Sequence, residues 1–187
     1  AQKNSDIQFQ EAFEPNLYPD VVSGNDPWES LESVHFTLFH HNENLAQKAM
    51  DILEEHWHKI VNQLAPREWS ELGTQRFKVY IHPSKAMFVE KTGASSWMEG
   101  LTKVWKKGGN VSTEIHLYQS APLLLSSIAP HELTHALYPS FLGYRVNLPL
   151  WLNEGIAISS EPPFRQRNRL QSLRVALRKK TLFSLEE

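Results

Sequence analysis

The segment "HELTH", residues 131–135, holds the residue types that zinc chemistry needs. In an α-helix, residues four apart lie about one turn apart on the same face, so His131 and His135 can present two imidazole nitrogens to one metal ion. Glu132 is rotated by about 100° from His131, which places it beside the ion rather than among its ligands. The spacing therefore predicts two metal ligands and a general base that acts on a water molecule.

A third ligand is expected, because catalytic zinc sites commonly use three protein ligands and leave the fourth position to water. Glu154 lies 19 positions after His135, within "PLWLNEGIAISSE", residues 149–161. That separation leaves room for a loop and for a second helix that carries Glu154 back to the metal. The chain has no cysteine, so thiolate ligands are excluded and the predicted ligands of one zinc ion are His131, His135 and Glu154.

The predicted second helix needs an apolar face of its own. Trp151, Leu152 and Ile156 are expected to supply this packing while Glu154 faces the metal. Gly155 is a poor helix former, and its presence suggests a close approach of the two helices.

Hydrophobic periodicity predicts the elements that come before these helices. Alternating apolar residues predict strands at 33–40 and 76–82. A helical stripe with Asn44 as a fair N-cap predicts a helix over 44–64. A short helix should run from Ser84 and stop at Gly93.

The remaining elements complete a mixed architecture. Residues 101–105 and 113–118 flank the turn "KKGGN" and should form a hairpin or two neighbouring strands. Three further helices are expected at about 120–138, 149–160 and 165–180. The order of elements indicates an α+β fold, in which helices pack on a small mixed or antiparallel sheet.

Pro130 directly precedes His131 and constrains how the metal-binding helix begins. A proline inside a helix removes one hydrogen bond and clashes with the preceding turn. Either Ser126 or Ser127 caps a new helix with Pro130 in its first turn, or one long helix is kinked at this point. Both alternatives leave residues 131–138 helical.

Composition bounds the class of protein. The 187 residues suffice for one domain with a proper core, and the net charge of −2 argues against nucleic acid as a general partner. No run of about 18 apolar residues is present, so no transmembrane segment is expected. Residues 165–180 carry seven bases and no acid, a pattern typical of a solvated helix face, with a membrane-surface or partner-binding role as the alternative.

The two ends of the chain carry further expectations. Residues 1–30 are polar and contain three prolines, which predicts an irregular arm packed over the domain of residues 31–187 by Phe9, Phe13, Tyr18 and Trp28. The start at Ala1 fits a mature chain after signal cleavage, or a trimmed one. With the lack of cysteine, this favours a secreted or periplasmic location. The end "TLFSLEE" reads like the middle of a longer domain.

The metal motif and its flanks resemble those of the gluzincin zinc metallopeptidases, and in particular the compact peptidase MA-like domains. The resemblance covers roughly residues 31–187. Besides His131-Glu-Leu-Thr-His135 and Glu154, it rests on three flanking patterns, which are Glu32-Ser33-Val34-His35-Phe36, Trp97-Met98-Glu99-Gly100 and Leu148-Pro149-Leu150-Trp151. It implies a thermolysin-like α+β half-domain with zinc between two helices, and a peptide or protein substrate.

The resemblance also implies roles for single residues. His131, His135 and Glu154 correspond to the zinc ligands and Glu132 to the catalytic base, and Asn153 resembles the residue beside the third ligand. These enzymes generally use a further donor to stabilise the oxyanion, and the local candidates are Tyr144, Tyr138 and His116. Met98-Glu99 partly matches an element that binds the substrate amine in aminopeptidases, although an ordinary loop role for Glu99 is the alternative.

The sequence therefore predicts a zinc-dependent peptidase, with the choice between endopeptidase and aminopeptidase left open. Residues 113–118 would provide a sheet edge on which a peptide can pair, or they form an ordinary internal strand. The alternative function is a zinc-holding, peptidase-like binding module whose catalytic activity is weak or lost. The presence of Glu132 favours the enzyme, because a metal site without catalysis has no use for that carboxylate.

Overall fold

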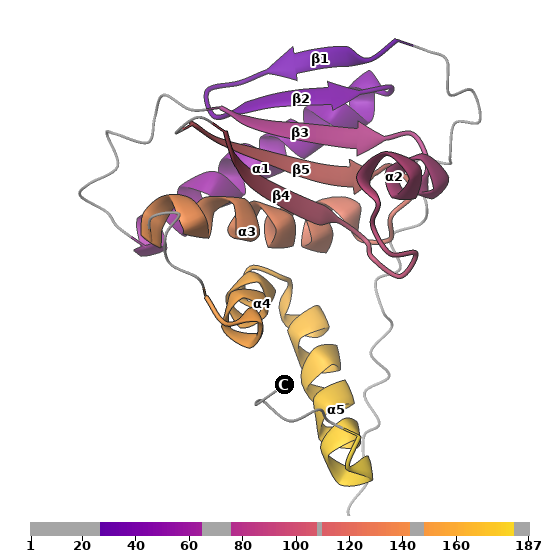
Figure 1. Ribbon diagram of the computed structural model, residues 1–187, viewed down its shortest axis with the longest axis vertical. Coiled ribbons are helices and arrows are strands. Elements are labelled where there is room, and N and C mark those ends of the chain that lie inside the picture. The colour runs from indigo at the N-terminus through magenta and orange to yellow at the C-terminus, as the bar shows by residue number, and fades with distance from the viewer. Residues whose placement is uncertain (1–26, 65–75, 108–109, 143–147, 182–187) are drawn as a thin grey trace, which may run out of the picture.

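A computed structural model describes residues 27–64, 76–107, 110–142 and 148–181 of the chain. Within them, five strands form one mixed sheet in the order β1-β2-β3-β5-β4 (Figure 1). β2, β3 and β5 run parallel to one another, and each flanking pair, β1 with β2 and β4 with β5, is antiparallel. The strands are β1 (Glu29–Glu32), β2 (Phe36–His40), β3 (Phe77–His82), β4 (Leu101–Lys107) and β5 (Asn110–Tyr118).

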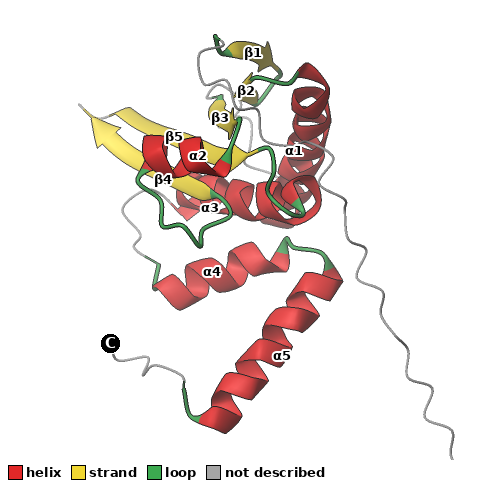
Figure 2. Ribbon diagram, turned by 90° about the vertical axis from the view of Figure 1, so that its right-hand side faces the viewer, coloured by secondary structure: helices red, strands yellow, loops and turns green. Residues whose placement is uncertain are grey.

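Helices cover this sheet and extend below it (Figures 1 and 2). α1 and α3 contact each other and pack against the sheet, while α2 packs against β3 and β5. α4 packs on α3, and α5 runs away from the body of the molecule. The helices are α1 (Glu43–Leu64), α2 (Lys85–Thr92), α3 (Ala129–Leu142), α4 (Leu150–Ser159) and α5 (Pro163–Lys179). The predicted α+β class is confirmed.

The core lies between the sheet and the helices α1 and α3. In β2, Phe36 and Leu38 alternate with half-buried neighbours and are fully buried, as the period of a strand requires. Leu53 of α1 and Leu133 of α3 are also fully buried and belong to the same cluster. Burying large aliphatic side chains contributes about 1.5–3 kcal/mol each, so this cluster fixes α3, and with it the metal motif, against the sheet.

Local sequence signals explain where two of the helices begin and end. The side chain of Ser84 accepts a hydrogen bond from the Met87 N–H, and Gly93 ends α2 in the left-handed conformation with φ of 71°, as predicted. The N-cap of α1 is Asn42 rather than the predicted Asn44, because the Asn42 Oδ1 accepts from the Leu45 N–H at 3.0 Å. The helix therefore begins at Glu43.

The predicted helix over 120–138 is wrong in its first half. Residues Leu124–Ile128 form a π-helical turn that follows Leu123 in a left-handed conformation, and α3 begins only at Ala129. Pro130 thus lies in the first turn of α3, where its missing N–H costs nothing. Neither predicted serine cap is used, because the π-helical turn leads directly into the helix.

The hairpin and the edges of the sheet bear on substrate binding. Strands β4 and β5 pair as the predicted antiparallel neighbours, from Leu101↔His116 to Lys107↔Asn110. Of the two alternatives for residues 113–118, the internal strand is confirmed, because β5 lies between β3 and β4, and the edge strands of the sheet are β1 and β4. β1 was not predicted as a strand, and it starts at Glu29, within the range expected for the arm. Residues 1–26, which hold most of that arm, lie outside the described residues.

No helix among the described residues has the length and apolar character that crossing a bilayer requires.

Candidate metal centre

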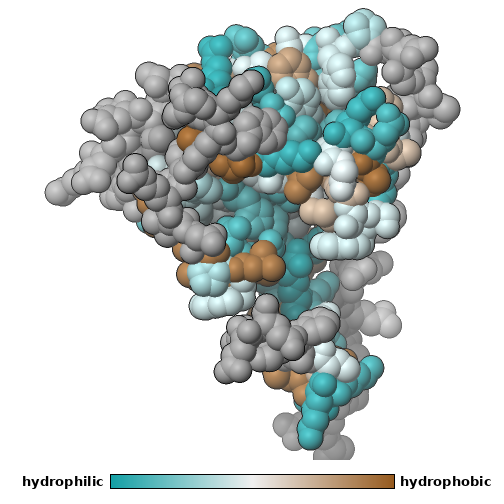
Figure 3. Space-filling view, viewed as in Figure 1, coloured by the Kyte–Doolittle hydropathy of each residue, from teal (hydrophilic) through white to brown (hydrophobic). Residues whose placement is uncertain are grey.

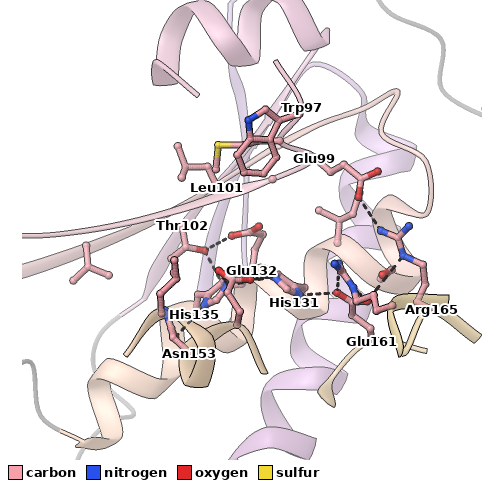
Figure 4. Close-up of a pocket in the computed structure, with 18 of the residues that line it drawn as sticks. Trp97, Glu99, Leu101, Thr102, His131, Glu132, His135, Asn153, Glu161 and Arg165 are labelled. Atoms are coloured by element: carbon pink, nitrogen blue, oxygen red, sulfur yellow. Dashed lines mark hydrogen bonds and ion pairs between the residues drawn. The ribbon is translucent and has the colours of Figure 1, made fainter. Parts of the chain in front are cut away.

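The three predicted ligands converge. His131 and His135 lie one turn apart on α3 (Figure 4), and Glu154 of α4 lies close to both. The two histidine Nε2 atoms are 3.2 Å apart. Glu154 Oε2 lies 3.5 Å from His131 Nε2, and Glu154 Oε1 lies 3.5 Å from His135 Nε2.

These separations suit one zinc ion. Bonds of about 2.0–2.2 Å to tetrahedral ligands require donor atoms about 3.3–3.5 Å apart, close to the three distances in the trio. The donor set, two imidazoles and one carboxylate, is also one that catalytic zinc uses. The residues therefore fit the metal predicted from the sequence.

Each histidine has a partner for its other ring nitrogen. Asn153 Oδ1 lies 3.2 Å from His135 Nδ1, and Glu161 Oε1 lies 2.8 Å from His131 Nδ1. Because an amide oxygen and a carboxylate both accept, these contacts favour protons on the two Nδ1 atoms. The two Nε2 lone pairs then face each other at 3.2 Å, an arrangement that a cation between them stabilises.

The charges around the trio also favour a cation. Burial lowers the pKa of His131, but the carboxylates of Glu154 and Glu161 outweigh this effect and raise it to about 9. Burial together with the charge on His131 lowers the pKa of His135. The pocket thus holds one positive charge readily and resists a second proton, and a bound metal ion can replace that proton.

Glu161 is the functional residue that the sequence analysis missed. Its side chain is only 1 % exposed, and both of its oxygens accept from the Arg169 guanidinium, at 2.8 and 2.6 Å. Burial raises the pKa of Glu161, but His131 and Arg169 lower it to about 2, so the carboxylate stays ionised. Its position seven residues after Glu154, next to a basic helix, was the available signal.

Arginines of α5 therefore take part in the site. Arg169 binds Glu161, and Arg165 Nη2 donates to Glu99 Oε2 at 2.8 Å. Two bases of the predicted solvated face thus have partners within the protein, although the side chain of Arg169 is still 44 % exposed. Leu170, Leu173 and Leu177 of the same helix are exposed.

Glu132 lies beside the trio in a tight pocket. Thr102 Oγ1 lies 2.7 Å from Glu132 Oε2 and 2.9 Å from its backbone oxygen, and can donate to either. Burial raises the pKa of Glu132 to about 7, although the Thr102 hydrogen bond and the charge on His131 lower it. The group is therefore poised to exchange a proton near neutral pH.

Gly100 makes room for that carboxylate. A Cβ atom at this position would lie 2.8 Å from Glu132 Cγ and 2.9 Å from both Glu132 Oε1 and Ile128 Cγ2. A side chain here would push Glu132 out of place. Close packing against Glu132 and Ile128 thus explains why a glycine occupies the last position of the Trp97-Met98-Glu99-Gly100 segment.

A cleft of about 770 Å³ opens over these groups. In the space-filling view, a hollow lined largely by hydrophilic residues lies between the sheet with α3 and the region of α4, with hydrophobic residues near its rim (Figure 3). Trp97, Val104 and Leu150 are exposed apolar residues that line the cleft, and Glu99 and Arg165 line it as well. The space suits part of a peptide chain.

Two predictions about the packing of α4 are wrong. Trp151 is 62 % exposed, and the fully buried residue of this helix is Ala157. A Cβ atom at Gly155 would meet nothing within 4 Å, so this glycine does not mark a close helix approach. Leu152 and Ile156 are half-buried.

Two of the three candidate oxyanion donors are among the described residues, and neither lines the cleft. Tyr138 and His116 do not line it, and His116 instead lies in the sheet, 3.2 Å from His82. Tyr144 lies outside the described residues. The cationic side chains that do line the cleft are Arg165 and Arg169, besides the two metal-binding histidines.

Comparison with known proteins gave no relative, since no protein-family model, curated protein or solved structure matches this chain.

Proposed function

We propose that this protein is a zinc-dependent peptidase whose ion is held by His131, His135 and Glu154. The observation that carries the proposal is the pair of Nε2 atoms facing each other at 3.2 Å, with an acceptor oxygen within 3.2 Å of each Nδ1 atom and the Glu154 carboxylate 3.5 Å from each Nε2 atom. The fold we propose for it is a thermolysin-like zincin half-domain, in keeping with the motif on α3 and the third ligand on α4.

The chain's own residues divide the chemistry between them. A bound zinc ion would polarise a substrate carbonyl and make a water molecule more acidic. Glu132 accepts the proton of the attacking water and later gives it to the leaving amine, a role that suits a carboxyl group with a pKa of about 7. Thr102 can hold the Glu132 side chain by a hydrogen bond to Oε2.

Substrate backbone pairs with β4 in this proposal. β4 is one of the two edge strands of the sheet, and its residues Leu101, Thr102 and Val104 line the cleft. An edge strand offers unpaired backbone donors and acceptors to an extended peptide. The exposed side chains of Trp97 and Leu150 would then contact apolar residues of that peptide.

A Glu132→Gln substitution tests the proposal. The amide keeps the shape of the side chain and does not act as a base, so peptide cleavage should fall by about 10²–10⁴-fold with zinc still bound. Zinc content by elemental analysis and cleavage of a mixed peptide library by mass spectrometry are the two measurements. Equal, zinc-dependent cleavage by both forms would refute the role of Glu132.

The alternative function is a zinc-holding binding module with weak or lost activity. One observation favours it: neither Tyr138 nor His116, the described candidates for the oxyanion donor, lines the cleft. Arg165 and Arg169 do line it, but they are paired with Glu99 and Glu161. Zinc binding without cleavage by the wild-type chain, together with capture of peptides by that chain, would support the module instead.

A further inference from the structure

A second group of potential metal ligands lies away from the cleft. Within the described residues, two groups of three side chains have donor atoms all within 4.8 Å of one another, and the second group is His35, Glu54 and His58. None of these three lines the cleft of the first. Both groups consist of two imidazoles and one carboxylate.

Two elements supply the second group. Glu54 and His58 are four residues apart on α1, so they share one face of the helix. His35 directly precedes β2, at Phe36. An ion held by all three would join the start of β2 to α1.

Glu54 is held in place before any ion binds. Its Oε1 accepts from the Ser33 hydroxyl at 2.6 Å and from the His35 backbone N–H at 3.1 Å. Its Oε2 lies 2.6 Å from His35 Nδ1. A carboxylate fixed in this way loses little conformational freedom when it becomes a ligand.

The ring of His35 is fixed as well. It stacks on Trp57 with the centroids 3.5 Å apart and the planes 14° from parallel. His58 stands at right angles to it, with a centroid distance of 5.7 Å. Two members of the group are therefore fixed by their contacts. The third, His58, is exposed, and a small rotation of its side chain can bring its ring nitrogen to the distance that a metal ion requires.

We propose that His35, Glu54 and His58 form a second site for a divalent transition-metal ion, such as zinc, which clips β2 to α1. Imidazole and carboxylate donors without thiolate suit zinc, nickel and copper(II). His58 is exposed, so water can complete the coordination, and the ion's proposed role is to join the start of β2 to α1. This site is independent of the proposed function.

Zinc stoichiometry tests the second site. We expect equilibrium dialysis of the wild-type chain, followed by elemental analysis, to give about two zinc ions per chain, and His58→Ala to give about one. His56→Ala is the matched control, because His56 lies on the same helix outside the group and should retain both ions.

A variant without the cleft ligands separates the two sites. His131→Ala/His135→Ala should keep about one zinc ion, and zinc should raise its melting temperature. Adding His58→Ala should abolish both effects. If His58→Ala binds as much zinc as the wild type, the second site is refuted, whereas loss of the cleft ion alone would bear only on the proposed function.

Discussion

The Glu161 carboxylate lies between His131 and Arg169. One of its oxygens is 2.8 Å from the Nδ1 atom of His131, and both accept from the guanidinium of Arg169. A candidate metal ligand of α3 is therefore contacted by a residue that follows α4, which a residue of α5 holds in turn. Partners of this kind typically change metal affinity by about 10–100-fold.

Glu161→Gln should weaken zinc binding by about 10–100-fold, because the amide holds the His131 ring less strongly and no longer balances Arg169. Competition with a zinc chelator measures the affinity. Arg174→Ala is the control, since Arg174 is exposed on α5, the helix that carries Arg169, and should leave the affinity unchanged. Equal zinc affinity of the wild type and Glu161→Gln would contradict this role.

Gly100→Ala should reduce peptide cleavage and leave zinc bound. The added Cβ would lie 2.8 Å from Glu132 Cγ, so the general base must move, whereas the three zinc ligands need not. A displacement of about 1 Å can cost about 10²-fold in rate. Gly155→Ala is the control, because a Cβ there meets nothing, and it should keep full activity. Full activity of Gly100→Ala would exclude this steric account.

Thr102→Val should move the acidic limb of the pH–activity profile to higher pH. The hydrogen bond from Thr102 lowers the pKa of Glu132, so its loss raises the pKa and keeps the base protonated up to a higher pH. Activity should therefore fall more at pH 6 than at pH 8. The measurement is kcat/KM across this range, and a uniform decrease at every pH would argue against the assignment.

His82 and His116 should make the fold less stable in acid. Burial lowers the pKa of each to about 4, while the unfolded chain titrates near 6.5. Between these values the unfolded state binds more protons, so the free energy of unfolding falls as the pH drops from 6.5 to 4. Each unit by which folding lowers the pKa of a histidine contributes about 1.4 kcal/mol to this fall.

Urea unfolding of His82→Gln and His116→Gln at pH 5 and pH 7.5 tests this stability effect. The difference in unfolding free energy between the two pH values should be smaller in each variant than in the wild type. Comparison with the wild type is needed, because Glu132, whose pKa is raised to about 7, has an opposite effect in the same range. An unchanged difference would mean that neither histidine is responsible.

Local signals predicted the parts of the structure that depend on local sequence. The cap at Ser84, the stop at Gly93 and the convergence of His131, His135 and Glu154 all follow from spacing along one or two helices. The order of the strands is different, because β3 pairs with β5 across a connection that includes α2 and β4, and no local pattern specifies that pairing. The sequence therefore left open whether residues 113–118 form an edge strand or an internal strand.

The partners of the ligands were harder to predict for a related reason. Asn153 adjoins Glu154 in sequence and was noticed, whereas the role of Glu161 depends on contacts from two other helices. The basic segment was interpreted from its composition alone, and only the fold shows that Arg165 and Arg169 line the cleft while the other described bases of α5 do not. Gly155 was misinterpreted because poor helix propensity does not reveal whether a neighbour is close.

The dependence of His131 on α5 has a practical meaning for shortened versions of the chain. No residue of α5 is buried, so removal of everything after Phe164 would leave the hydrophobic core and all three zinc donors intact. Such a fragment would nevertheless contain Glu161 without its counter-charge, a buried anion beside the metal. A deletion series would therefore identify α5 as indispensable although it contributes no ligand.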